Sequence, residues 1–306
     1  MSDLLNSETK SGQNLIPPSQ EQTDALLEMV KEQMDLDTFN PNDHELLKRI
    51  IESLGDSRGL VRMRVAETLG QIGELATPFL MEALADHPNV VVRRASAKTL
   101  TIIADPKAVP VLVHSFLNDE DTVVQGSSVG ALARTGETAV PPLLEILADS
   151  NSSENTKGHA AWALAFIGAQ AKEYIYKVID SSSPDVRAAV IGAIAKILQE
   201  NPQEEAFGIV VKALGDPDTN VRCEAAAVLG NLSYRPAVAH LISLLHHPDW
   251  QSRKAAALAL MKIGDRTALE PLQAALGQES EIGVQPVIKL AISQIEKQSQ
   301  QDDDWE

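Results

Sequence analysis

The sequence predicts an all-α fold, an α-solenoid in which helical hairpins stack into a right-handed superhelix. The first observation is a repeat, whose best copy spans residues 216–245. A Val-Arg pair or its equivalent anchors each copy and returns at intervals of 30 to 35 residues, a period that marks a solenoid. The anchors are Arg62, Arg93, Gln125, Lys157, Arg187, Arg222, Arg253 and Gln285.

The second observation is the spacing of apolar residues within each copy. The third, fourth, seventh and tenth residues after the anchor are apolar or small, as at Ala225, Ala226, Leu229 and Leu232. This spacing puts them on one face of a helix, where alanine also allows a close approach of helices. A second apolar helix follows, often opened by Ala-Val-Pro, because proline in a first turn loses no hydrogen bond. Such a hairpin cannot bury its own apolar face, so it needs its neighbours.

Strand signals form the third observation, because they are nearly absent. The only β-branched run covers residues 90–92 and falls at the junction between a loop and a helix. Alternation of apolar and polar residues, the pattern of a half-buried strand, is not sustained elsewhere. The sequence therefore predicts helices alone.

The chain is expected to begin with a tail and a cap. Residues 1–21 are polar and rich in Ser, Gln and Asn, which is typical of disorder. Residues 22–42 are expected to form a capping helix, over about 23–34, and a connector, because a terminal repeat needs a polar outer face. The first repeat helix is expected over residues 44–54.

Eight anchored copies fill residues 43–296 and are expected to form one elongated domain, since a stack is not limited by a single core. The last copy has Pro286 directly after its anchor and is expected to cap the array. Residues 297–306 contain three consecutive aspartates and are expected to form an acidic, disordered tail.

The composition narrows the choice of partners. A net charge of −17 argues against nucleic acid and against an anionic membrane surface, because both require basic side chains. The longest apolar run, residues 160–169, is far shorter than the roughly 20 residues of a membrane span. The first residues carry acid where a signal peptide needs base, so an intracellular protein is expected. The single cysteine, Cys223, excludes an internal disulfide.

An acidic residue stands six positions before an arginine anchor in two copies, as Asp56 before Arg62 and Asp216 before Arg222. The acid suits the start of a helix, and the arginine is expected to reach it or a nearby loop carbonyl. We interpret these pairs as structural and not as a binding site.

The candidate binding surface is a second stripe, formed by the residues two, five, six and nine positions after each anchor. Most of these residues are small, which predicts a smooth groove floor. The fourth copy differs, because its stripe reads His159, Trp162, Ala163 and Phe166. Aromatic rings suit stacking against a conjugated ligand or anchoring of a partner helix. The alternative is that Trp162 fills space between repeats.

Two other features are interpreted as structural. The pair His246 and His247, with His240 nearby, is expected to lie in a turn between helices, since its spacing matches no strong metal-ligand motif. Cys223 follows Arg222 at a helix start and is expected to be an ordinary helix residue, the alternatives being a transient covalent acceptor or a ligand of a borrowed metal. No motif demonstrates catalysis, so no catalytic residue and no metal site is predicted.

The repeat motif, Asp-x-x-x-x-Val-Arg-x-x-Ala-Ala-x-x-Leu-Gly at residues 216–230, resembles the short HEAT-like repeats named after phycobilisome lyases. With residues 158–168, the organisation is similar to that of a cyanobacterial and plastid family. That family includes phycocyanobilin lyase subunits, chaperone-like relatives, a phycobilisome-degradation factor and a partner of an iron-sulfur scaffold. The resemblance implies binding of a linear tetrapyrrole or of a phycobiliprotein, in the cytoplasm or the plastid stroma.

The leading hypothesis is therefore a binding protein of the bilin-lyase type, which assists attachment or removal of a bilin at a cysteine. The bilin, for example phycocyanobilin, would rest on His159, Trp162 and Phe166, with its propionates at Arg134 and Lys196. No tightly bound cofactor is expected. The expected partner is a phycobiliprotein subunit or another HEAT-repeat lyase subunit. The alternative is a non-catalytic interaction scaffold, with an iron-sulfur scaffold protein as its partner.

Overall fold

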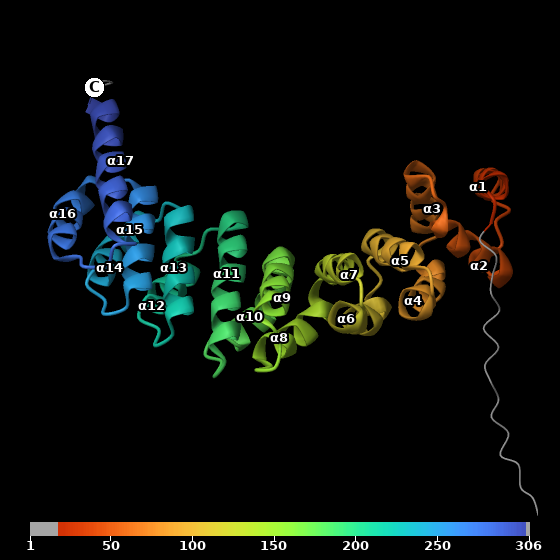
Figure 1. Cartoon of the computed structure of the whole chain (residues 1–306), viewed down its shortest axis with the longest axis horizontal. Coiled ribbons are helices and arrows are strands. Elements are labelled where there is room, and N and C mark those ends of the chain that lie inside the picture. The colour runs from red at the N-terminus through yellow and green to blue at the C-terminus, as the bar shows by residue number, and fades with distance from the viewer. Residues whose placement is uncertain (1–17, 304–306) are drawn as a thin grey trace, which may run out of the picture. The chain divides into compact units, whose positions relative to one another are not determined.

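A computed structural model describes residues 18–303, with side chains for residues 18–298, and shows helices joined by turns (Figure 1). No strand occurs in this range, so the predicted all-α solenoid is confirmed, whereas its right-handedness stays a prediction. Among the same residues no helix is both long and apolar enough to cross a membrane. The α-helices are α1 Gln20–Asp35, α2 His44–Glu52, α3 Gly59–Ile72, α4 Thr77–Asp86, α5 Val90–Ile103, α6 Val109–Asn118, α7 Thr122–Arg134, α8 Val140–Ala148, α9 Glu154–Ile167, α10 Lys172–Lys177, α11 Pro184–Glu200, α12 Glu204–Ala213, α13 Thr219–Asn231, α14 Val238–Leu244, α15 Trp250–Ile263, α16 Leu269–Gln278 and α17 Gln285–Asp303.

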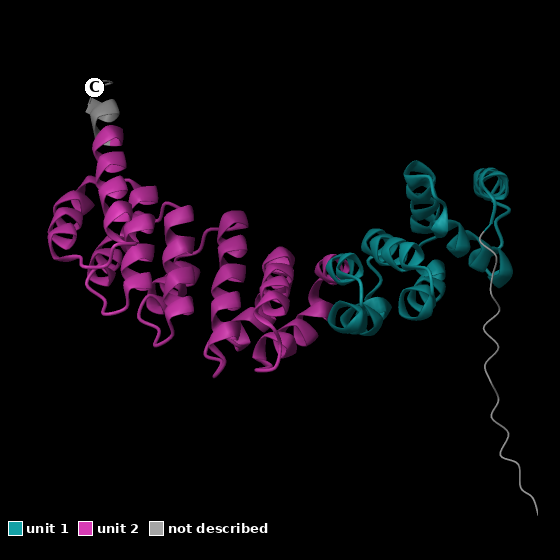
Figure 2. Ribbon diagram, viewed as in Figure 1, with its two compact units in different colours: residues 1–128 teal, residues 129–306 magenta. Residues whose placement is uncertain are grey.

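The chain divides into two compact units, residues 1–128 and 129–306, and the boundary falls within α7 (Figure 2). The constant period of the repeats does not predict this division. In the second unit the anchored helices α9, α11, α13, α15 and α17 lie side by side in chain order. Each of them also packs on the helix that precedes it, from α8 against α9 to α16 against α17. The predicted stacking of helical hairpins is therefore present within this unit.

The predicted core positions are largely buried. In α3 the side chains of Val65 and Leu69 are fully buried, and in α13 so are those of Ala225, Ala226 and Leu229. These residues face the neighbouring helices of the stack, so burial of their apolar surface stabilises the array only where a neighbour is present. The second helices begin as expected, with Pro110 and Pro141 in the first turn of α6 and α8.

Both chain ends differ from the prediction at their boundaries. Helix α1 begins at Gln20, within the stretch expected to be disordered, because Ser19 and Gln22 form a capping box. The Ser19 hydroxyl accepts a hydrogen bond from the Gln22 N–H, and the Gln22 side chain accepts one from the Ser19 N–H. At the other end α17 continues to Asp303, through most of the expected acidic tail. Residues 1–17 and 304–306 lie outside the described residues.

The anchor side chains form a ladder between loops and neighbouring repeats. Arg222 donates hydrogen bonds to the carbonyl oxygens of Asp216 and Pro217, at 2.7 and 2.9 Å, and Arg62 reaches the Asp56 carbonyl at 2.6 Å. The arginine therefore contacts the backbone of the acidic residue six positions earlier and not its carboxylate. The Asp216 carboxylate pairs with the anchor of the preceding copy, through two hydrogen bonds of 2.8 Å from Arg187, whereas the Asp56 carboxylate in the first copy pairs with Arg58.

The same rung recurs in both units, which confirms the structural interpretation of these pairs. Gln125 and Gln285 keep only the carbonyl contact, since an amide has no charge with which to pair. Lys157 keeps only the contact to the next repeat, with its Nζ 2.6 Å from Asp185. The charged rungs are Arg93 to Asp119, Lys157 to Asp185, Arg187 to Asp216, Arg222 to Asp249 and Arg253 to Glu279.

Gly230 lies where α13 packs tightly against α15. A Cβ atom at this position would lie 2.8 Å from the Cα of Ala259, a backbone atom that has no room to move. We expect Gly230→Ala to lower the free energy of unfolding by about 1–3 kcal/mol, the usual effect of overpacking a core. Urea denaturation followed by circular dichroism measures this change.

The matched control for Gly230→Ala is Gly208→Ala in α12. No atom lies within 4 Å of a Cβ added at Gly208, so the better helix propensity of alanine is expected to raise stability by about 0.5–1 kcal/mol. Equal effects of the two substitutions would show that the α13–α15 contact is looser than described.

Candidate functional site

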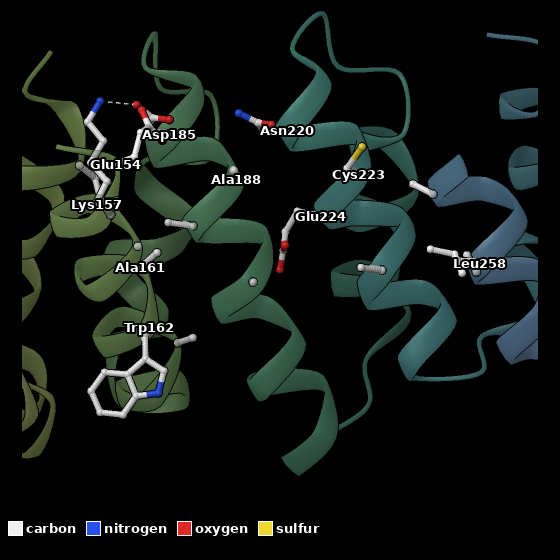
Figure 3. Close-up of a pocket in the computed structure, with 18 of the residues that line it drawn as sticks. Glu154, Lys157, Ala161, Trp162, Asp185, Ala188, Asn220, Cys223, Glu224 and Leu258 are labelled. Atoms are coloured by element: carbon white, nitrogen blue, oxygen red, sulfur yellow. Dashed lines mark hydrogen bonds and ion pairs between the residues drawn. The ribbon is translucent and has the colours of Figure 1, made fainter. Parts of the chain in front are cut away.

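A groove with a volume of about 700 Å³ runs across α9, α11, α13 and α15 in the second unit (Figure 3). Small side chains form most of its floor, so an occupant can lie close to the helix backbones. Trp162 lies towards one end of the drawn stretch of α9, and Lys157 lies towards the other end. The floor alanines are Ala161, Ala165, Ala188, Ala189, Ala227, Ala255 and Ala259.

The lining positions shift along the array. On α15 they are the residues two, five, six and nine after the anchor, as predicted. On α9 they are instead the residues one, four, five and eight after the anchor, so Ala161 lines the groove and Ala163 is buried. The prediction is therefore right for α15 and off by one residue for α9.

On α11 and α13 the position after the anchor, occupied by Ala188 and Cys223, was missed. This position lies one helical turn before the fifth position after the anchor, which was predicted correctly. Residues four apart share a helix face, so that spacing could have identified it.

Trp162 is the aromatic side chain of the groove. Its side chain is 51% exposed, which contradicts the alternative that it fills space between repeats. Phe166, one turn further along α9 and 49% exposed, packs against it with ring centroids 5.7 Å apart and planes tilted by 37°. Neither Phe166 nor the exposed His159 belongs to the groove lining that the described residues define. The structure thus brings one of the three predicted side chains directly into the groove.

The cations of the groove differ from those predicted. Arg134, exposed in the last turn of α7, does not line it. Lys196 also lies outside the lining, with its stem against Gly168 and its Nζ 3.5 Å from a carboxylate oxygen of Glu200. Lys157 and Lys262 line the groove instead. The hydrogen bond from Lys157 to Asp185 raises the pKa of the lysine, so its charge is retained at any physiological pH.

Cys223 lines the groove near the start of α13 (Figure 3). Burial raises the pKa of its thiol, and the nearby carboxylate of Asp249 raises it further, although the Arg222 guanidinium acts in the opposite direction. A thiol with a raised pKa is protonated near neutral pH and is a poor nucleophile. The geometry therefore supports the interpretation of Cys223 as an ordinary helix residue.

The histidine pair lies between α14 and α15, as predicted. The Nδ1 atom of His247 accepts a hydrogen bond from the N–H of Asp249 at 3.1 Å, and Asp249 caps α15. His247 therefore helps to form the turn. No group of three His, Cys, Asp or Glu residues suited to hold a metal ion occurs in the part of the chain that the structure describes.

These features define a class of protein, a helical-repeat protein with a shallow groove floored by small residues. HEAT repeats match residues 46–133, 77–154, 140–207 and 208–292. The bilin biosynthesis protein MpeU from Synechococcus sp. (strain WH8020) is 40% identical over 280 residues, which cover 91% of this chain and 94% of that protein. The bilin biosynthesis protein PecE from Mastigocladus laminosus is 26% identical over 206 residues, or 64% of this chain and 62% of PecE.

Among solved structures, the karyopherin Kap121p bound to the extreme C-terminus of Cdc14p aligns with a TM-score of 0.57 at 15% identity, over 92% of this chain and 38% of Kap121p. This likeness concerns the fold alone and agrees with an α-solenoid. The chain belongs to the phycobilisome lyase family of HEAT-repeat proteins. It is a HEAT-repeat protein of the bilin-lyase type.

Proposed function

We propose that the protein binds a linear tetrapyrrole such as phycocyanobilin in this groove and assists its attachment to, or removal from, a cysteine of a phycobiliprotein. The observation that carries the proposal is the half-exposed Trp162 at an alanine floor, in a family whose relatives are named bilin biosynthesis proteins. These relatives favour the bilin over the alternative of a partner in iron-sulfur assembly.

The dimensions and chemistry of the groove suit this ligand. Its volume of about 700 Å³ falls within the range of about 300–1,000 Å³ that is usual for small-molecule sites. A conjugated tetrapyrrole is flat and apolar on its faces, so it can lie on alanine side chains and against the face of Trp162. Its propionates would pair with Lys157 or with Lys262, on the two outer helices of the groove, which replace the predicted Arg134 and Lys196 as the cations that line it.

The contribution of this chain to attachment would be positioning. Holding the bilin in a fixed place turns its encounter with an acceptor thiol into a step within one complex, which raises the effective concentration of the reactants. The acceptor protein supplies the thiolate, since the pKa of Cys223 is raised. A phycobiliprotein subunit, alone or with a second HEAT-repeat lyase subunit, is the proposed partner.

A visible-absorbance titration of phycocyanobilin with the purified protein tests the proposal. Saturable binding in the groove is expected to shift and sharpen the long-wavelength band of the bilin. An unchanged spectrum at saturating protein would refute the ligand part of the proposal. In that case, binding of a purified iron-sulfur scaffold protein in calorimetry would support the interaction scaffold instead.

A further inference from the structure

Glu224 is an acidic side chain in the floor of the groove, where the neighbouring helices carry alanine. It stands two positions after the anchor of α13, and the equivalent residues are Ala189 on α11 and Ala255 on α15. Figure 3 shows its carboxyl group directed into the space between α11 and α13. The side chain is largely withdrawn from solvent, and burial raises its pKa. A polar group in such a position is unfavourable unless it has a partner.

Within the residues that the structure describes, no hydrogen bond or ion pair satisfies the Glu224 carboxyl group. This distinguishes it from the acidic residues of the ladder. Asp216 is bound by Arg187, and Asp249 is bound by Arg222 and Ser252. Asp185, which also lines the groove, is bound by Lys157. Glu224 is therefore an acidic group of the groove floor that the fold itself does not use.

Gly192 on the facing helix α11 makes room for this carboxyl group. A Cβ atom at position 192 would lie 3.0 Å from Oε1 of Glu224, closer than ordinary van der Waals contact. The equivalent positions on the other three helices hold Trp162, Ala227 and Leu258. Glycine inside a helix is less favourable than alanine by about 1 kcal/mol, so its presence here needs a reason. The close approach of the carboxyl group to the α11 backbone is that reason.

We propose that Glu224 recognises the pyrrole N–H groups of a linear tetrapyrrole in the groove and determines how the bound bilin is oriented and protonated. The proposal rests on the proposed function and deepens it. The inner edge of an open-chain tetrapyrrole carries several N–H donors that converge on one side, and a carboxyl group accepts hydrogen bonds from such donors. The propionates lie on the opposite edge and are repelled by the Glu224 carboxylate, so they turn towards Lys157 or Lys262.

A proton transfer accompanies this contact. The unprotonated pyrrole nitrogen takes up a proton, from solvent or from the Glu224 carboxyl group, which forms a new N–H bond and leaves a carboxylate paired with a cationic bilin. No other reactant is required. The partial burial of Glu224 in the groove floor strengthens the ion pair. The other titratable groups that line the groove are Glu154, Lys157, Asp185, Cys223 and Lys262.

The experiment compares the wild-type protein with Glu224→Gln in titrations with phycocyanobilin. Loss of a hydrogen bond to a charged group is expected to weaken binding about ten- to a hundredfold. The intensified, red-shifted band of the protonated bilin is expected in the wild-type protein and absent in Glu224→Gln, at pH values from 6 to 9. The matched control is Glu173→Gln, an exposed residue of α10 outside the groove, which is expected to behave as wild type.

A second variant separates the role of the carboxyl group from an effect on folding. Gly192→Ala places a methyl group against Glu224 and is expected to weaken binding and diminish the protonated band, while helix propensity maintains or raises the melting temperature. A wild-type affinity and band in Glu224→Gln would overturn the inference and leave the proposed function intact. Absence of bilin binding by the wild-type protein would overturn both.

Discussion

Replacing Arg222 by alanine is expected to lower the free energy of unfolding by about 3–5 kcal/mol, the range observed when one partner of a buried ion pair is removed. Arg222 is only 4% exposed. Its guanidinium also donates hydrogen bonds to the Ser252 hydroxyl at 2.8 Å and to the Thr219 hydroxyl at 2.9 Å. The substitution therefore leaves a buried hydroxyl, a carboxylate and two loop carbonyls without their donor, and it cuts the link between α13 and α15.

The stability lost in Arg222→Ala is expected to depend on pH through Asp249. Burial alone would raise the pKa of Asp249, but hydrogen bonds from Ser252, Gln251 and Arg222 together lower it to about 2. Because the folded pKa lies below the unfolded value of about 3.9, this stabilisation is fully present above that value. It is lost as the pH falls towards 2.

Urea midpoints at pH 7 and pH 2.5 measure this dependence. The difference between wild type and Arg222→Ala is expected to shrink at pH 2.5, because this pH lies below the unfolded pKa of Asp249 and close to the folded one, so much of the stabilisation from the ionised carboxylate has been lost. Arg235→Ala, which removes an exposed guanidinium from the same unit, is the control and is expected to change stability by less than about 0.5 kcal/mol. A pH-independent loss for Arg222→Ala would show that packing, and not the ion pair, is its main contribution.

Trp162→Ala is expected to weaken binding of phycocyanobilin about 30-fold or more, as truncation of a central aromatic contact usually does. The indole is the largest apolar surface in the groove, and removing it exposes one face of the ligand to water. Because Trp162 is 51% exposed, the melting temperature is expected to change by only a few degrees. The same absorbance titration measures the affinity, and thermal unfolding measures the stability.

Trp250→Ala is the matched control for Trp162→Ala. Trp250 begins α15, is 41% exposed and does not line the groove. Its removal is expected to leave bilin affinity at the wild-type level. Equal losses of affinity in the two variants, or collapse of the fold in Trp162→Ala, would contradict the assignment of Trp162 to the binding surface.

The fold was more predictable from the sequence than the site was. Val65, Leu69, Ala225 and Leu229 are buried as expected, because the apolar spacing of a helix and its anchor repeat in every copy. The first and last residues of the terminal helices are determined by short local motifs, which are easier to overlook than the repeat. The Ser-x-x-Gln motif at Ser19 starts α1 inside a stretch whose composition indicates disorder.

The site was predicted only in part, because neighbouring helices decide which flank of each helix stays open. The ninth position after the anchor shows this directly. Lys196 occupies it on α11 and lies outside the groove, whereas Lys262 occupies it on α15 and lies inside. A fixed stripe cannot reproduce a lining that shifts by one residue between α9 and α15. Glu224 and Gly192 fall in the predicted stripe, but their contact depends on two helices at once, so no single-helix pattern reveals it.

On α13 the anchor ladder and the groove floor occupy different positions of the same helix. Arg222 connects α13 to α15 through its hydrogen bond to Asp249. Glu224, two residues further on, forms no hydrogen bond or ion pair with the described residues. Residues of the groove floor that contact a ligand can therefore be substituted without loss of the hydrogen bonds and ion pairs that hold the repeats together. Substituting the alanines, glycine and glutamate of the floor would yield proteins for differently shaped or charged pigments on an unaltered frame, which makes this array a suitable starting point for engineered chromophore binding.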